Sequence, residues 1–145
     1  MAVLMVTAFS CSKEDDESSS DPEGTMSKTL YSQQYAYEEL RFGSARVHLS
    51  GSNLVTYNTC EIAYYGQVKG LGGIKKIPQS GWTDDAAATA NAGYVVRFED
   101  GTYCRIFISE VRSELYQDRA CYMCTNYITF TRYFADVKYQ YPFEP

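Results

Sequence analysis

Residues 93–108 read GYVVRFEDGTYCRIFI, and this stretch decides the class of fold. Two runs rich in β-branched and aromatic residues flank Asp100-Gly101, a pairing that strongly signals a β-hairpin. With Asp100 and Gly101 as a two-residue loop, Phe98 pairs with Tyr103. The same register places Val96 opposite Arg105 and Tyr94 opposite Phe107, with Val95, Arg97, Cys104, Ile106 and Ile108 on the other face. Since both faces are largely apolar, we expect this hairpin at the centre of the fold.

Shorter strands are predicted on both sides of this hairpin. Residues 45–49 and 54–57 flank a Ser-Gly-Ser-Asn turn and form a second hairpin candidate, and residues 60–68 alternate in polarity. Residues 127–134 and 137–143 are rich in threonine and aromatic residues. Strands this short and closely spaced predict an all-β, mainly antiparallel domain: a compact β-sandwich or small barrel with at most one or two short helices.

Two segments are ambiguous between helix and strand. Residues 83–91 begin Thr-Asp-Asp-Ala-Ala-Ala, which could cap and start a short helix. Residues 110–120 could form another, because Val111 and Leu115 are four apart.

The charge of the chain is concentrated near its beginning. Six acidic residues and one lysine in residues 12–25 account for the whole net charge of −5, so the rest of the 145-residue chain is neutral overall. A neutral domain lacks the basic surface that phosphate backbones require, which argues against a nucleic-acid partner. The hydrophobic content of 45% excludes a mostly disordered protein, and the length fits one folded domain.

The first 25 residues have the pattern of a signal peptide followed by a flexible linker. Residues 1–10 form an apolar run ending in small residues before Cys11, which resembles the lipobox of bacterial lipoprotein signal peptides. In that class the cysteine is lipidated and becomes the first residue of the mature protein. The absence of a basic segment predicts a true start upstream of Met1. The alternative is a buried N-terminal strand that contains a cysteine.

The residues after Cys11 favour the lipoprotein interpretation. Residues 12–21 are acidic and serine-rich, which predicts a solvated linker. They resemble the acidic signal that directs Bacteroides-type lipoproteins to the outer face of the outer membrane. The expected organisation is a signal-peptide remnant (1–10), a lipidated cysteine with an acidic serine-rich linker (11–25) and a single β-domain (26–145), facing outward from the cell envelope.

A family resemblance extends over most of the chain. It is carried by DPEGT (21–25), GQVKGLGGI (66–74), IPQSGW (77–82), GYV (93–95) and VKYQYPF (137–143). Together these motifs resemble a group of small Bacteroides-type surface lipoproteins of unknown function. The chain departs from that pattern in residues 118–134. The resemblance implies location and class, brings no catalytic residues, and implies an extended path for residues 84–92.

Four cysteines follow the linker. Cys121 and Cys124 have the C-x-x-C spacing of redox motifs and metal knuckles, but a thioredoxin-like site needs a βαβ setting that is absent here. A zinc site would need Cys60 and Cys104 as well. We favour structural roles, as disulfides or buried thiols, in an exported protein. A bridge between Cys60 and Cys104 beside one between Cys121 and Cys124 is one of three possible arrangements.

No catalytic set is visible, and no metal or cofactor is expected. His48 is the sole histidine and falls on the polar side of its predicted strand, and no Gly-x-Ser-x-Gly elbow is present. The glycine-rich residues 66–73 lack the Gly-Lys-Ser/Thr of a P-loop and are typical of a turn or bulge.

The aromatic residues provide the remaining functional hypothesis. Trp82 lies next to Asp84 and Asp85, an arrangement that suits stacking on sugar rings, and Tyr94 could extend the platform. The alternative is that Trp82 closes the end of the core. We expect a non-catalytic outer-membrane surface lipoprotein that binds a polysaccharide or a surface protein. The alternative function is an envelope thiol-redox or metal-binding protein that uses Cys121 and Cys124.

Overall fold

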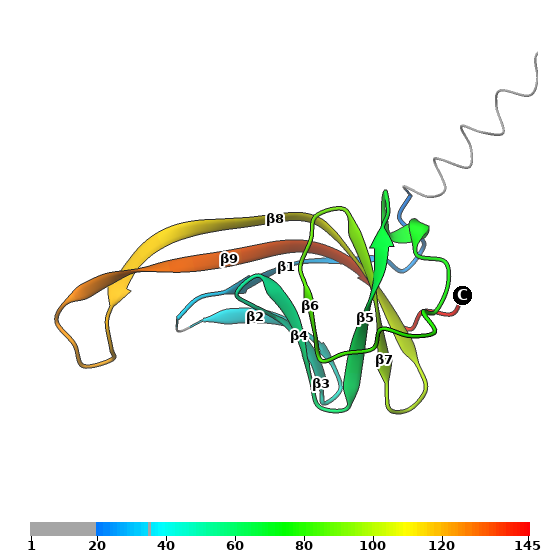
Figure 1. Ribbon diagram of the computed structural model, residues 1–145, viewed down its shortest axis with the longest axis horizontal. Coiled ribbons are helices and arrows are strands. Elements are labelled where there is room, and N and C mark those ends of the chain that lie inside the picture. Colours follow the sequence, from blue (N-terminus) through cyan, green and yellow to red (C-terminus); the bar gives the residue numbers. More distant parts are fainter. Residues whose placement is uncertain (1–19, 35) are drawn as a thin grey trace, which may run out of the picture.

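The computed structural model of the protein describes residues 20–34 and 36–145. In these residues nine strands form one antiparallel sheet, in the order β5-β7-β8-β9-β1-β2-β3-β4-β6 (Figure 1). The strands are β1 (Met26–Ser32), β2 (Tyr37–Phe42), β3 (Ala45–Ser50), β4 (Asn53–Tyr57), β5 (Cys60–Gln67), β6 (Asp85–Ala87), β7 (Ala92–Phe98), β8 (Tyr103–Arg119) and β9 (Tyr127–Gln140), and a 3-10 helix, η1 (Leu71–Gly73), follows β5. The described part of the chain has no helix with the length and hydrophobicity needed to cross a bilayer.

The sheet curls into a nearly closed barrel. Thr83, just before β6, exchanges two backbone hydrogen bonds with Ile62 of β5, and each N–H donates to the other residue's carbonyl oxygen at 2.9 Å. On the other side, the Thr56 N–H of β4 donates to the Asp84 carbonyl oxygen, also at 2.9 Å. The predicted all-β, mainly antiparallel fold is confirmed, and a barrel is the architecture present.

The barrel interior is a packed apolar core. Its side chains come from alternate residues of the strands, as expected for a sheet with one face turned inward. The buried members are Leu30, Leu40, Ala45, Val47, Leu49, Leu54, Cys60, Ile62, Ala92, Tyr94, Val96, Phe98, Cys104, Ile106, Ile108, Ala135 and Val137. The predicted hairpin at residues 45–49 and 54–57 is confirmed, and its strands contribute to this core.

The central hairpin forms, but its predicted register is wrong by one residue. Val96 pairs with Cys104, not with Arg105. The loop has three residues, 99–101, and the last is a glycine with φ 87°. A slip of one residue moves a side chain to the opposite face of a sheet. Cys104 and Ile106 therefore share the interior with Val96, and Arg105 faces outward.

A second apolar cluster covers the outer face of β7 and β8. It consists of Leu71, Ile74, Val95, Phe107 and Phe143, with Tyr65, Val68, Ile77, Trp82 and Tyr103 packed against it. We call the segment that lies over this face, residues 68–82, the cover. Arg105 holds the cover in place, because its Nη1 donates to the carbonyl oxygens of Leu71 and Ile74 at 3.4 and 2.8 Å. The cover lies so close to β7 that a Cβ on Gly93 would come within 2.7 Å of the Ile74 side chain.

Neither of the two segments that were ambiguous between helix and strand forms a helix. Residues 85–87 form the short strand β6, which agrees with part of the extended path that the family resemblance implies for residues 84–92, whereas residues 90 and 91 form a turn. Residues 110–119 continue β8, and each pairs with a residue of β9. Spacing of four between Val111 and Leu115 is weak evidence for a helix, since a partner strand satisfies the same backbone groups.

Candidate functional site

β8 and β9 continue beyond the barrel as an arm, residues 109–134, which Figure 1 shows curving away from the body. β1 pairs with β9 as far as Tyr133, so the arm has two strands only beyond that residue. The ladder shifts register between Ile108 and Glu110, where the chain leaves the barrel. Such a bulge bends a strand and redirects the residues beyond it. The pairing then runs without a break from Glu110 opposite Asp136 to Arg119 opposite Tyr127.

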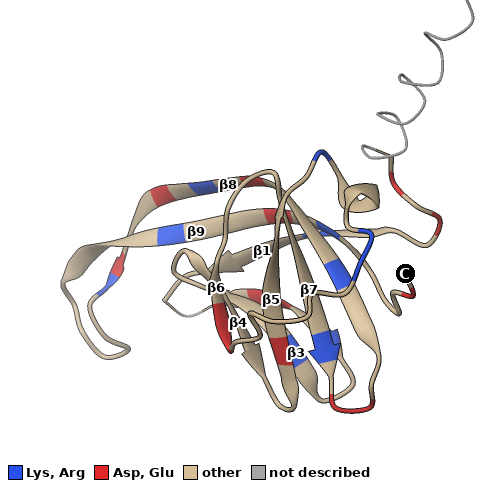
Figure 2. Cartoon of the chain, turned by 45° about the vertical axis from the view of Figure 1, so that its right-hand side comes forward, with Lys and Arg blue, Asp and Glu red and all other residues tan. Residues whose placement is uncertain are grey.

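The outer face of the arm carries ion pairs between the strands and arginine side chains that lie over aromatic rings. Arg112 bonds to Asp136 at 2.7 Å and lies over the Phe134 ring at 4.7 Å. Arg132 bonds to Glu114 at 2.7 Å and lies over the Tyr116 ring at 4.4 Å. Figure 2 shows acidic and basic residues alternating along β8, with a basic residue beside them on β9. These cross-strand contacts stabilise the ribbon from one side.

The inner face of the arm carries apolar side chains that are open to solvent. This face continues the barrel interior, because Val111 pairs with the buried Ala135. Leu115 is 73% exposed and Tyr127 is 59% exposed. At the base of the arm, Val111 and Tyr133 border an apolar recess of about 240 Å³ that reaches Leu49 of the barrel. Large exposed apolar side chains grouped on one face mark interaction sites.

The tip of the arm is closed by the Cys121–Cys124 disulfide. Tyr122 and Met123, between the two cysteines, are each 83% exposed. The C-x-x-C motif thus closes a hairpin loop at the end of a long ribbon. Within the part of the chain that the structure describes, no group of three His, Cys, Asp or Glu side chains is placed to hold a metal ion.

Cys60 and Cys104 are free thiols in the barrel core, so the bridge considered between them does not form. Burial raises the pKa of the Cys104 thiol far above its ordinary range. Burial also raises the pKa of Cys60, which donates to the Arg46 and Tyr57 carbonyl oxygens. A thiol held in its neutral form is a poor nucleophile, so these two cysteines serve packing.

The structure does not assemble the predicted aromatic platform. Trp82 is half-buried, and one face of its indole is covered by the Arg97 guanidinium at 4.4 Å. Arg97 is held there by Glu61, at 2.7 Å. Tyr94 is fully buried and its hydroxyl donates to the Ala87 carbonyl oxygen at 2.5 Å, so its proposed role in ligand contact is wrong.

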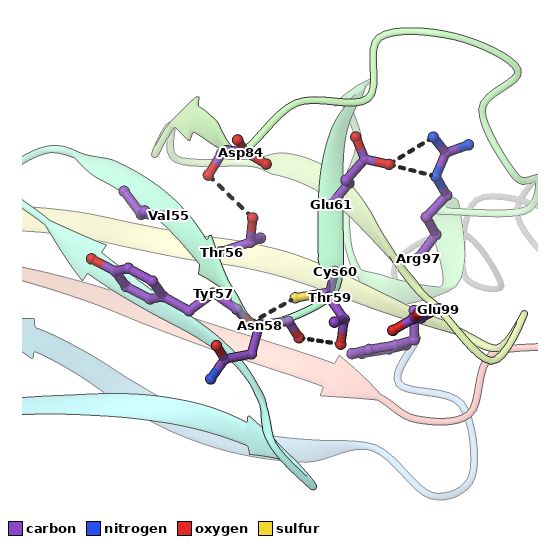
Figure 3. A pocket seen from close by; sticks show the side chains of 11 residues that line it. Val55, Thr56, Tyr57, Asn58, Thr59, Cys60, Glu61, Asp84, Arg97 and Glu99 are labelled. Carbon is purple, nitrogen blue, oxygen red and sulfur yellow. Dashed lines mark hydrogen bonds and ion pairs between the residues drawn. The ribbon is translucent and has the colours of Figure 1, made fainter.

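Asp84 and Asp85 lie exposed at the seam of the barrel. Asp84 borders an open groove of about 840 Å³, together with Glu61, Arg97 and Glu99 (Figure 3). Its backbone carbonyl accepts the Thr56 N–H and hydroxyl, so the peptide at Asp84 helps to close the barrel. Since Arg97 is paired with Glu61, the groove presents two further carboxylates, which suit hydroxyl or cationic groups better than anions.

His48 points outward from β3, as its strand position predicts. It is half-buried between the rings of Tyr37 and Tyr57, at centroid distances of 6.3 and 4.7 Å. Burial lowers its pKa, which favours the neutral imidazole.

Sequence reasoning missed the inner face of the arm. Val111, Ser113 and Leu115 alternate with charged residues, a period of two that favours a strand, but the spacing of four between Val111 and Leu115 is also compatible with a helix and left the segment ambiguous. The lipidation candidate, Cys11, lies outside the described residues.

Comparison of the chain with models of protein families, with curated proteins and with solved structures finds no match.

Proposed function

We propose that this protein is a non-catalytic surface lipoprotein of the outer membrane, anchored through Cys11, whose barrel presents the arm to a protein partner. The exposed apolar inner face and tip of the arm carry this proposal. Leu115, Tyr122, Met123 and Tyr127 are each more than half exposed, although large apolar side chains favour burial. A protein surface would shield them from water.

The placement of the anchor relative to the arm supports the same function. Asp21 pairs with Lys138 at 2.8 Å, and the Ser20 carbonyl accepts the Gly72 N–H of η1 at 3.3 Å. These first described residues lie at the right of Figure 1, and the tip of the arm lies at the far left. An anchor at this end would hold the tip away from the membrane, where a partner can reach it.

A protein fits the arm better than a polysaccharide does. Sugar sites combine an open aromatic face with hydrogen-bonding side chains. Arg97 covers one face of Trp82, whereas Tyr122 and Met123 project freely. Tyrosine and methionine are enriched where proteins meet.

Photo-cross-linking on intact cells tests this function. The photo-reactive residue p-benzoylphenylalanine replaces Tyr122 in one chain and Tyr57, exposed on the barrel strand β4, in the matched control. We expect a discrete cross-linked product with a different protein from position 122 and none from position 57. In a Cys11→Ser chain that carries the same probe at position 122, loss of the anchor should release the protein and abolish the product. Equal products from both positions, or no product from 122, would contradict the proposal.

A further inference from the structure

We propose that two copies of this chain pair through the free edges of their β8 strands, in an antiparallel register centred on Ser113. The proposal goes beyond the function above, because it uses the edge of the arm and leaves both inner faces open. Its partner is a second copy of the same chain.

The edge that would pair is long and lacks a neighbour. β7 pairs with β8 only as far as Ile108, opposite Ala92. From residue 109 to 119, β8 pairs with β9 on one side and with no other described strand on its second side. Eleven residues of strand extend about 36 Å at roughly 3.3 Å per residue. An open edge of this length is a template for another strand.

The charges of β8 and the length of its free edge together select one register. Centring on Val111 would also set Glu110 against Arg112, but it would overlap only residues 109–113. In an antiparallel pair with twofold symmetry, residues whose numbers sum to 226 face each other when Ser113 lies on the axis. Arg112 then faces Glu114 of the second copy, and Val111 faces Leu115 of the second copy. Each contact occurs twice by symmetry. Opposite charges and apolar pairs across strands are both favourable.

The adjacent registers that keep the faces aligned are unfavourable. Centring on Arg112 places two arginines together, and it sets Glu110 against Glu114. Centring on Glu114 places two glutamates together, and it sets Glu110 against Asp118. Centring on Leu115 forms a contact between Arg112 and Asp118, but it leaves Val111 against Arg119. Like charges directly opposite each other destabilise a strand pair.

The outer face of the arm extends this charge pattern across four strands. Within one copy, Asp136 bonds to Arg112 and Glu114 bonds to Arg132, each at 2.7 Å. In the Ser113 register, the order across the joined arms is Asp136, Arg112, Glu114 of the second copy and Arg132 of the second copy. The signs alternate from one arm to the other, so each intrachain pair reinforces the contact between copies.

The length of the free edge fits this overlap. The Asn91 N–H donates to the Ile108 carbonyl oxygen at 2.8 Å, which closes the edge on the barrel side. An overlap of residues 109–117 on each copy ends just before that point, so residues 118–126 of the second copy would have to bend out of the plane of the sheet beyond it. The joined arms would form a four-stranded ribbon with a barrel at each end.

Disulfide trapping tests the register. The full chain with Cys11→Ser and Ser113→Cys, at micromolar concentration with a mild thiol oxidant, should form a covalent dimer linked at position 113. The facing Cβ atoms would lie about 4.5–5.5 Å apart. The matched control is Gln117→Cys on the same face, whose two sulfurs would be eight residues apart along the strand and should not link. Equal linking at both positions, or none at 113, would overturn the proposal.

A charge rescue tests the facing residues without cysteine. Val111→Glu and Leu115→Lys each remove two apolar contacts per dimer, which should raise the dissociation constant about tenfold in sedimentation. The double variant places each introduced glutamate opposite the introduced lysine of the second copy and should restore the original value to within about threefold. A double variant weaker than either single variant would overturn the register. A monomer that still cross-links a different protein through position 122 would overturn the dimer and leave the proposed function standing.

Discussion

Replacing Ile106 with alanine should lower the free energy of unfolding by about 2–5 kcal/mol, because Ile106 is fully buried in the barrel core. The change removes three methyl or methylene groups and leaves a cavity lined by rigid strands, which relax only partly around it. Thermal or denaturant unfolding of the purified protein measures the effect.

Leu115→Ala on the same strand is the matched control. Leu115 lies nine residues further along β8, on the arm, and is 73% exposed. Its truncation should change the free energy of unfolding by no more than about 0.5 kcal/mol. Comparable losses from Ile106→Ala and Leu115→Ala would contradict the division of β8 into a barrel half and an arm half.

Arg105→Met should release the cover over the outer face of the barrel. The variant keeps most of the side-chain length but leaves the Leu71 and Ile74 carbonyl oxygens without their guanidinium donor. Loss of hydrogen bonds to a charged group, with acceptors left in a partly buried site, should cost about 2–4 kcal/mol. The Phe143 ring would also lose the guanidinium that lies 4.5 Å above it.

Trypsin reports directly on this loss. Lys75 and Lys76 are exposed in the covering segment, and cleavage there should become faster in Arg105→Met as the segment opens. Arg105→Lys, which keeps a cation with a shorter reach, should show an intermediate rate. An unchanged cleavage rate in Arg105→Met would show that the apolar cluster alone holds the cover.

The central hairpin shows which features of the fold local sequence patterns can predict and which they cannot. The two strands and their turn were predictable, because β-branched and aromatic runs around Asp100-Gly101 leave few alternatives. The register was not predictable, since Asp-Gly also fits a three-residue loop with Gly101 in the left-handed region, at φ 87°. The outward position of Arg105, which fastens the cover, followed from that single residue of loop length.

The arm could not be predicted from the sequence for a different reason. Residues 110–120 have no strong preference for helix or strand, so their conformation depends on β9, a partner 8 or more residues away in the chain. The same dependence on tertiary contacts explains why Tyr94 and Trp82 do not form the predicted aromatic platform. Their types suit a sugar site, but Tyr94 faces the core and Trp82 lies under Arg97.

Hydrogen exchange along β8 tests most directly the claim that the second edge of β8 is open along the arm. It is best measured in the Leu115→Lys chain at a concentration well below the dissociation constant that sedimentation gives for this variant, so that the arms of two copies do not pair. We predict that amides of residues 104–108 exchange only on global unfolding, whereas alternate amides between 110 and 119, which point to the open edge, exchange at least about 100-fold faster. Uniform slow exchange from residue 104 to 119 would contradict the account, because it would mean that the edge of the arm is already covered within one chain.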